Sequence, residues 1–176
     1  MNIILVGFMA SGKSSLSRYM ATRTKRQALD LDIEIEKRAQ MSIPKIFETV
    51  GEKAFRDLES YVTKLCKNYH NTIIATGGGC ILREENRRAL KEAGLVIWLN
   101  TSPENVQKYT AKRNNRPLLK GDKSLNDITQ MMKKREALYA DSSHLKIDVF
   151  QHNLEEIFDI IQSYKDQFLA QEYAKP

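Results

Sequence analysis

The chain has 176 residues, which is enough for one domain with a sizeable hydrophobic core. With 41% hydrophobic and 28% charged residues, its composition is that of an ordered globular protein. The formal net charge of +6 suits either a nucleic-acid-binding protein or an enzyme whose positive field attracts ATP and an acidic substrate. The basic residues are spread along the chain and no nucleic-acid-binding motif is visible. We therefore favour the enzyme and expect no nucleic-acid partner.

The sequence also predicts where the protein works. No apolar run approaches the ~20 residues that span a bilayer, so we expect no membrane partner. The first predicted strand starts at Asn2, which leaves no space for a signal peptide. Cys66, Cys80 and the three histidines have the spacing of neither a disulfide framework nor a zinc site. These features predict a reduced, cytoplasmic location.

Taken in order, the chain alternates predicted strands and helices. Strands are predicted at Asn2–Val6, Gln27–Asp32, Thr72–Thr76, Leu95–Leu99 and Leu145–Phe150. Helices are predicted at Ser15–Ala21, Ile33–Gln40, Ile43–Val50, Glu52–Asn68, Glu84–Ala93, from Ser102 onward, at Leu125–Ala140 and at Leu154–Leu169. Ser102 is a good helix cap because proline and glutamate follow it. The pattern predicts an α/β fold whose parallel sheet is covered on both faces.

A phosphate-binding loop follows the first strand. Residues Gly7–Ser14 match the pattern GxxxxGK[ST], and they stand between a predicted strand and a predicted helix, as this loop requires. Gly7 and Gly12 carry no side chains, so backbone N–H groups can point at phosphate oxygens, and the helix N-terminus adds partial positive charge. Lys13 can reach the β- and γ-phosphates, and the Ser14 hydroxyl can bind Mg²⁺.

Two further features follow strands of the same predicted sheet. In open α/β sheets ligands bind beyond the carboxyl ends of the strands, so these features and the phosphate loop converge on one edge. Asp30 and Asp32 end the second strand, and in extended chain their carboxylates point to the same side, toward metal and substrate hydroxyl. The alternative is a solvated strand end or a helix cap. Gly77–Gly79 end the third strand, which indicates either a flexible turn or the close approach of a ligand or of the phosphate loop.

Together these motifs resemble those of the shikimate kinase family, and the resemblance runs from about Asn2 to Leu169. The phosphate loop alone indicates only that a nucleoside triphosphate is bound, whereas the other motifs are specific. The motifs are Gly7–Ser14, the pair Asp30 and Asp32, Ser42–Phe47, Gly51–Glu59 (Gly-Glu-x-x-Phe-Arg-x-x-Glu), Thr76–Gly79, Arg116–Leu119, and Arg135 with Tyr139.

The resemblance implies the organisation of the chain. It implies the three-layer α/β/α fold of P-loop NTPases, similar to nucleoside monophosphate kinases, with sheet order 2-3-1-4-5. It implies one kinase domain over residues 1–170, with a substrate-binding segment at about 32–60 and a mobile lid at about 110–123. Residues 171–176 are predicted to be a frayed tail. We expect a monomer.

The resemblance also implies roles for single residues. Ser14 and Asp30 match the Mg²⁺ side of the site, with Asp30 acting through water. Asp32 matches the residue that hydrogen-bonds the hydroxyl groups of shikimate, and it is the candidate base for the attacking hydroxyl. Arg56 and Arg135 match the arginines that hold the shikimate carboxylate. Gln40, Ser15 and Tyr109 depart from the family pattern; at Tyr109 many members place an arginine that packs on adenine.

The remaining roles concern phosphate transfer. Gly78 matches a backbone contact to the substrate, and Gly77 and Gly79 are assigned to the same site. Arg116 matches a lid arginine that swings onto the ATP phosphates, and Lys13 bridges phosphate and transition state. The implied catalytic residues are Lys13, Asp32 and Arg116. The implied nucleotide-binding residues are Ala10, Ser11, Gly12, Lys13, Ser14, Ser15, Arg116 and His152.

The chemistry of the arginines agrees with this resemblance. A small carboxylate is best held by the rigid fork of donors that arginine offers. Arg56 lies three residues before Glu59 on one helical face, so Glu59 can orient it. Arg135 and Tyr139 are four residues apart and likewise share a face. For an isolated arginine a solvated surface position is the better interpretation.

The sequence therefore predicts a Mg²⁺-dependent kinase that transfers the γ-phosphate of ATP to the 3-hydroxyl of shikimate, a step towards chorismate and the aromatic amino acids. One alternative has the same fold and phosphorylates another small hydroxy acid such as gluconate, but the pair Arg56 and Arg135 argues against it. Another alternative is a non-catalytic nucleotide-binding or RNA-associated protein. This alternative is disfavoured because the chain has all four residues of the phosphate and acid motifs, Lys13, Ser14, Asp30 and Asp32.

Overall fold

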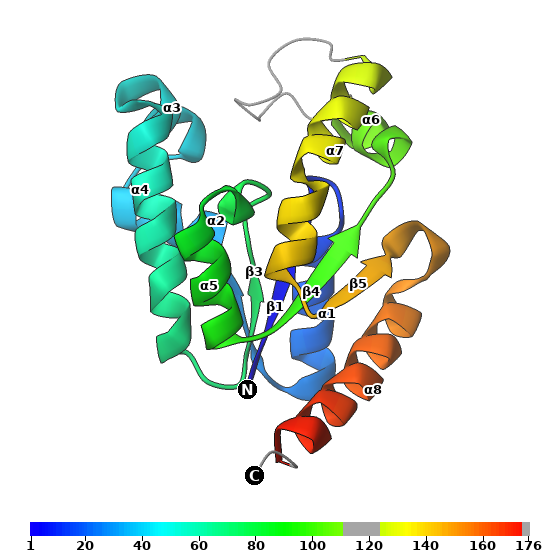
Figure 1. Cartoon of the computed structure of the whole chain (residues 1–176). Coiled ribbons are helices and arrows are strands. Elements are labelled where there is room, and N and C mark those ends of the chain that lie inside the picture. Colours follow the sequence, from blue (N-terminus) through cyan, green and yellow to red (C-terminus); the bar gives the residue numbers. More distant parts are fainter. Residues whose placement is uncertain (111–123, 174–176) are drawn as a thin grey trace.

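The computed structural model describes residues 1–110 and 124–173, with a five-stranded parallel sheet at its centre (Figure 1). The strand order is β2-β3-β1-β4-β5, and every neighbouring pair is parallel. The strands are β1 (Asn2–Val6), β2 (Gln27–Asp30), β3 (Thr72–Ala75), β4 (Gly94–Asn100) and β5 (Leu145–Asp148). This topology confirms the predicted α/β fold and the predicted strand order.

Helices connect these strands. The α-helices are α1 (Lys13–Thr24), α2 (Leu31–Ala39), α3 (Ile43–Thr49), α4 (Gly51–Lys64), α5 (Glu84–Ala93), α6 (Pro103–Thr110), α7 (Leu125–Ser142) and α8 (Leu154–Tyr173). Short 3₁₀-helices are η1 (Leu65–Asn68), η2 (Cys80–Leu82) and η4 (Val149–Gln151). Because parallel strands need long crossovers, each strand is followed by helix before the chain returns to the sheet.

The sheet is covered on both faces, and the central strand shows how. Successive side chains of a strand point to opposite faces. Ile3 and Leu5 of β1 pack in the cluster that contains residues of α1 and α8. Ile4 and Val6 pack in the larger cluster with residues of α4, α5 and α7. All four side chains are fully buried, which explains why the sequence of β1 is a continuous run of apolar residues.

The end of β2 differs from the prediction. Strand β2 ends at Asp30, which caps helix α2, and Asp32 lies in the first turn of that helix. The Asp30 carboxylate accepts a hydrogen bond from the Asp32 backbone N–H at 3.1 Å. The expectation that both residues sit in extended chain is therefore wrong and the helix-cap alternative is confirmed for Asp30, although both aspartates do line one cavity. Asp30 satisfies a backbone donor that the helix leaves unpaired, and this favours an earlier helix start.

Other boundaries shift by a few residues. The predicted helix Glu52–Asn68 becomes α4 followed by the tighter η1. Helix α8 runs to Tyr173, so the first residues of the predicted tail 171–176 are helical. Residues 174–176 lie outside the described residues, as do Arg116 and residues 111–123 of the predicted lid.

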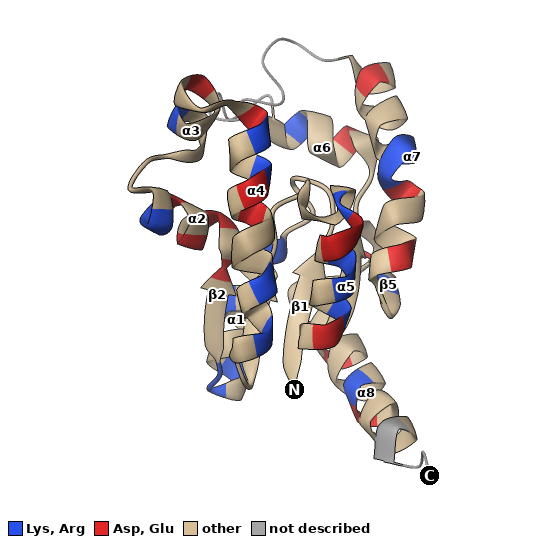
Figure 2. Ribbon diagram, turned by 60° about the vertical axis from the view of Figure 1, so that its left-hand side comes forward, with Lys and Arg blue, Asp and Glu red and all other residues tan. Residues whose placement is uncertain are grey.

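The helices carry charges of both signs on their outer surfaces. Figure 2 shows Lys and Arg interspersed with Asp and Glu along α2, α4, α5 and α7. None of the helices in the described part of the chain combines the length and apolar character that crossing a membrane requires.

Asn2 joins three segments at the amino-terminal edge of the sheet. Its side-chain Nδ2 donates to the carbonyl oxygens of Tyr69 at 2.6 Å and Ala93 at 3.0 Å. Its Oδ1 accepts from the backbone N–H of Thr72 at 3.0 Å. The side chain is almost wholly buried, so these backbone groups have little access to water. Asn2 thus ties the start of β1 to the starts of β3 and β4.

We expect Asn2→Ala to lower the free energy of unfolding by about 2–3 kcal/mol, because it leaves buried donors and acceptors unpaired. Urea denaturation followed by circular dichroism measures the change. Asn68→Ala is the control, since Asn68 is exposed in η1, and it should change the stability by less than about 0.5 kcal/mol. Equal effects of the two substitutions would contradict the role of Asn2.

Candidate active site

The candidate site lies at the carboxyl ends of the strands. The phosphate loop follows β1, Asp30 ends β2, and Gly77–Gly79 follow β3. Strand β1 lies between β3 and β4, so the phosphate loop is flanked by the glycines on one side and by the start of α6 on the other. The predicted convergence of these features on one sheet edge is confirmed.

The phosphate loop folds around Lys13. The Lys13 ammonium donates to the carbonyl oxygens of Gly7 at 2.8 Å and Phe8 at 2.9 Å, and only 8% of the residue is exposed. Gly12 has φ +84° and caps the N-terminus of α1. A Cβ at Gly7 would overlap with the carbonyl oxygen of Leu99. The loop therefore needs glycine at Gly7 for space and at Gly12 for backbone conformation.

Ser14 and Asp30 lie together, as predicted. The Ser14 hydroxyl donates to Asp30 Oδ2 at 2.7 Å. Both are hard oxygen ligands of the kind that Mg²⁺ prefers, and Mg²⁺ with phosphate takes only one or two protein ligands. Across residues 1–110 and 124–173, no three His, Cys, Asp or Glu side chains cluster as a metal site. The residues present fit a Mg²⁺ that phosphate oxygens also hold.

A cavity of about 280 Å³ lies beside this pair and gathers the predicted substrate-binding residues. Those lining it are Asp32, Arg56, Gly77, Gly78, Gly79 and Arg135. Its other wall is apolar, formed by Ile43 and Pro44 of α3 together with Phe47 and Phe55. These four residues fall within the predicted substrate-binding segment of about 32–60, but none of them was singled out as a substrate contact. A cavity that combines charged side chains with apolar ones suits a small cyclic acid.

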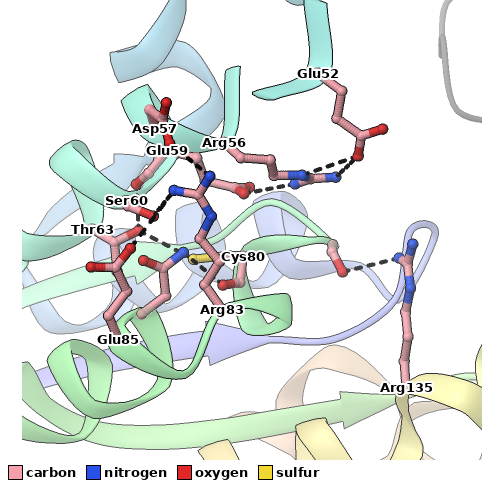
Figure 3. A network of polar contacts seen from close by, with 12 residues as sticks. Glu52, Arg56, Asp57, Glu59, Ser60, Thr63, Cys80, Arg83, Glu85 and Arg135 are labelled. Carbon is pink, nitrogen blue, oxygen red and sulfur yellow. Dashed lines mark hydrogen bonds and ion pairs between the residues drawn. The ribbon is translucent and has the colours of Figure 1, made fainter. Parts of the chain in front are cut away.

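Arg56 is held by two carboxylates. It donates to Glu59 Oε2 at 2.6 Å and to Glu52 Oε1 at 3.2 Å, and only 7% of the residue is exposed (Figure 3). The predicted orientation of Arg56 by Glu59 is confirmed. Burial lowers the pKa of Arg56, but Glu59 and Glu52 outweigh it and raise that pKa above its ordinary value. Burial also raises the pKa of Glu59, and Arg56 opposes this rise.

Arg135 and Tyr139 both reach the carbonyl oxygen of Gly78. Arg135 Nη1 donates to it at 3.4 Å and the Tyr139 hydroxyl donates at 2.7 Å. The Tyr139 ring stacks on Trp98 of β4, with centroids 5.6 Å apart. Burial raises the pKa of Tyr139, so its hydroxyl remains a donor at neutral pH. The shared helical face predicted for Arg135 and Tyr139 is confirmed.

The three glycines are needed for close approach. A Cβ at Gly77 would lie 2.6 Å from Asp32 Oδ1, and one at Gly78 would lie 3.3 Å from the backbone nitrogen of Met9 in the phosphate loop. A Cβ at Gly79 would overlap with the Arg56 guanidinium. The predicted approach of the phosphate loop is therefore confirmed at Gly78, while Gly77 and Gly79 leave space for the Asp32 and Arg56 side chains.

A second cavity, of about 490 Å³, lies on the other side of the phosphate loop. Ala10, Ser11, Gly12 and His152 of the predicted nucleotide site line it, together with Tyr109. A small pocket of about 110 Å³ is lined by the phosphate loop and by Gly78 of the glycine loop, Gly77–Gly79. Its lining includes Lys13, Ser14, Ser15, Asp32 and Gly78. Sequence reasoning missed the polar residues Thr101, Asn105 and Lys108, which also line the larger cavity.

Comparison with known proteins identifies this arrangement. The family model for shikimate kinase matches residues 9–165. The chain belongs to the shikimate kinase family. It is therefore an ATP-dependent kinase, and the predicted family and enzyme class are confirmed. The shikimate kinase of Burkholderia thailandensis is 41% identical over 147 residues, which cover 84% of this chain and 80% of that protein.

Other shikimate kinases match over nearly the whole chain. That of Alkaliphilus oremlandii is 42% identical over 166 residues, covering 91% of this chain and 96% of the relative. A solved structure of the shikimate kinase from Acinetobacter baumannii, in complex with shikimate, superposes with a TM-score of 0.87 at 34% identity. That superposition covers 99% of this chain and 95% of the Acinetobacter chain.

Both cysteines are buried, and neither is among the residues that line the two cavities. Cys80 follows the glycine loop, and its Sγ lies 3.2 Å from the Thr63 hydroxyl. Burial raises the pKa of Cys66 to about 12 and also raises that of Cys80. Both thiols therefore remain protonated at neutral pH.

We expect the native protein to react with a thiol reagent such as dithionitrobenzoate only slowly at pH 8, because the thiolate is the nucleophile and both sulfurs are buried. The measurement is absorbance on reagent addition, with protein unfolded in urea as the control. Both cysteines should react at once in the unfolded sample. Fast reaction of two thiols in the native sample would contradict the burial.

Proposed function

We propose that this kinase transfers the γ-phosphoryl group of ATP to the 3-hydroxyl of shikimate, giving 3-phosphoshikimate and ADP. The observation that carries the proposal is one cavity in which Arg56 and Arg135, from two different helices, meet Asp32 and the Ser14–Asp30 pair. The Acinetobacter baumannii relative is described in complex with shikimate, which supports the same substrate here. The family match favours shikimate over another hydroxy acid and over a non-catalytic role.

The cavity suggests how the acid would be oriented. Arg56 and Arg135 would hold its carboxylate, because guanidinium groups match a planar carboxylate with paired donors. Asp32, at the end of the cavity shared with the phosphate pocket, would accept hydrogen bonds from ring hydroxyl groups. The carbonyl and amide groups of Gly77–Gly79 lie along the same wall. A carboxylate fixed at one end directs one hydroxyl toward the phosphate.

ATP would occupy the larger cavity with its phosphates on the loop Ala10–Ser15. His152 lines this cavity and could contact the nucleoside, whereas Tyr109 lines both this cavity and the small phosphate pocket. Ser14 and Asp30 would hold Mg²⁺, which neutralises phosphate charge when bound. Lys13 would turn from the carbonyl oxygens of its own loop to phosphate oxygens, and this exchange needs only a side-chain rotation.

Proton transfer would fall to Asp32. Its carboxylate lines both the substrate cavity and the phosphate pocket, as a base for the attacking hydroxyl must. Phosphoryl transfer needs mostly positioning and charge neutralisation, so Lys13 and the lid residue Arg116 would stabilise the transferring group. We retain the proposed layout of one domain over 1–170, a substrate-binding segment at about 32–60 and a lid at about 110–123. The expected monomer also remains part of the proposal.

ADP release from Mg·ATP, measured with and without shikimate, tests the function. We expect turnover that depends on both shikimate and Mg²⁺. A parallel assay with gluconate tests the alternative acid. A folded protein that binds ATP but shows no response to shikimate would overturn the proposal.

For Asp32→Asn we expect kcat to fall by about 10²–10⁴-fold, the usual loss when a general base is removed. The carboxamide keeps the size of the side chain but cannot take the proton. Glu34→Gln is the matched control on the same helix, because Glu34 pairs with Arg38 at 2.7 Å and does not line the cavity. Turnover of Asp32→Asn at the wild-type rate would keep the kinase and remove Asp32 as its base.

For Arg135→Gln we expect the KM for shikimate to rise about 10- to 100-fold, the loss typical of one charged hydrogen bond. The KM for ATP should change less than about twofold, because Arg135 lines only the acid cavity. Lys134→Gln makes the same charge change on the neighbouring exposed residue and should leave both constants unchanged. Equal rises in the two KM values would contradict a carboxylate contact.

A further inference from the structure

The two arginines of the acid cavity come from helices far apart in the sequence. Arg56 lies on α4 and Arg135 on α7 (Figure 3). The Arg56 guanidinium lies against Gly79 and Arg135 donates to the carbonyl oxygen of Gly78, so both contact the glycine loop. A carboxylate can be gripped by both groups only if the two helices keep a fixed separation. The short helix η2, directly after Gly79, is the segment that lies between them.

Arg83, at the junction of η2 and α5, is bonded to α4. Its Nη2 donates to Asp57 Oδ1 at 2.7 Å and its Nη1 donates to the buried Ser60 hydroxyl at 3.1 Å (Figure 3). Asp57 and Ser60 are the sequence neighbours of Arg56 and Glu59. Arg83 therefore grips the same helical turn that presents the Arg56–Glu59 pair.

Arg87, one turn further along α5, is bonded to α7. Its Nη1 donates to the carbonyl oxygen of Ile81 in η2 at 2.9 Å, and its Nε donates to Asp141 Oδ2 at 2.5 Å. Asp141 lies on α7 two residues after Tyr139, whose hydroxyl bonds to Gly78. Only 13% of the Arg87 side chain is exposed, so its position is well restricted.

The segment Cys80–Arg87, which carries these two arginines, is bonded to the glycine loop. The backbone N–H of Cys80 donates to the carbonyl oxygen of Gly77 at 3.2 Å. The Asn86 side chain, fully buried on α5, donates to the carbonyl oxygen of Cys80 at 2.9 Å. One short segment thus carries the glycine loop, the bond to α4 and the bond to α7.

We propose that Arg83 and Arg87 are positioning residues that set the separation of Arg56 and Arg135 and so tune binding of the acid substrate. Neither lines the acid cavity, so they would act without touching the substrate. Their partners Asp57 and Asp141 are each more than half exposed, and exposed ion pairs add little stability. We therefore expect Arg83 and Arg87 to affect the separation of Arg56 and Arg135 more than the stability of the fold. The inference rests on the proposed phosphorylation of shikimate.

Steady-state kinetics of Arg87→Gln test the proposal. We expect a three- to tenfold rise in the KM for shikimate, with the KM for ATP and kcat within twofold of wild type. Arg88→Gln is the matched control: Arg88 is the next residue, is 74% exposed, and pairs with Glu84 inside its own helix. It should leave all constants unchanged. Arg83→Gln should act as Arg87→Gln does, through the α4 side.

Asp141→Asn serves if Arg87→Gln fails to fold, because it alters only an exposed partner. It also weakens a contact from Lys91 at 3.9 Å, so Lys91→Gln is measured beside it and should have no effect. A thermal melt by circular dichroism checks the folding of every variant. Arg87→Lys should restore part of the shikimate affinity, since it keeps a donor at this position.

A double-mutant cycle separates positioning from general damage. If Arg87 acts through Arg135, then Arg87→Gln should add less than twofold to the shikimate KM in the Arg135→Gln background. Fully multiplicative effects, or an unchanged shikimate KM in both Arg87→Gln and Asp141→Asn, would overturn the inference while leaving the kinase intact. Wild-type protein without shikimate-dependent turnover would overturn the proposed function, and this inference with it.

Discussion

The approach of two backbone loops is the constraint on which the site depends. Strand β1 pairs in parallel with β3, and the pairing is continued by the backbone N–H and the hydroxyl of Thr76, which both donate to the carbonyl oxygen of Leu5, at 3.1 Å and 3.0 Å. This brings Gly78 against the phosphate loop, where even a methyl group would crowd Met9. The phosphate pocket and the acid cavity therefore adjoin and share Ser14, Asp32 and Gly78 as lining residues.

The closeness of the two spaces determines which charged groups the protein must supply. Two anionic substrates must lie side by side, so the protein supplies cations whose positions are fixed beforehand. Arg56 is fixed by Glu52 and Glu59, and a buried ion pair of this kind contributes more to orientation than to stability. Lys13 is kept inside the phosphate loop by carbonyl oxygens of that loop. Preorganised charge of this type is what phosphoryl transfer requires, since it involves little covalent chemistry with the protein.

Contacts among the helices and the glycine loop complete this arrangement. Tyr139 and Arg135 converge on one carbonyl oxygen, and the stacking of Tyr139 on Trp98 relates α7 to the sheet. Arg83 and Arg87 link the helices on either side of the glycine loop. The precision of the site thus depends on contacts between helices α4, α5 and α7, which lie on one face of the sheet (Figure 1).

The sequence by itself determined the alternation of strands and helices and the phosphate loop, because these follow from local patterns: apolar runs that end in glycine or aspartate, and a motif whose spacing is a property of one segment. The pair Arg56 and Glu59 was predictable for the same reason, since three residues along a helix bring side chains together. The strand order and the set of residues in the acid cavity came from the resemblance to the shikimate kinase family.

Only the tertiary structure decided the rest. At Asp30 the structure decided between the strand end and the helix cap that the sequence left open, because the Asp30 carboxylate accepts a hydrogen bond from the Asp32 N–H. Ile43 and Phe47 meet Arg135 of α7 in one cavity, and Arg87 of α5 bonds to α7, so both contacts join segments distant in sequence. Such contacts depend on how helices pack across the sheet, and the local sequence does not specify which segment each residue meets.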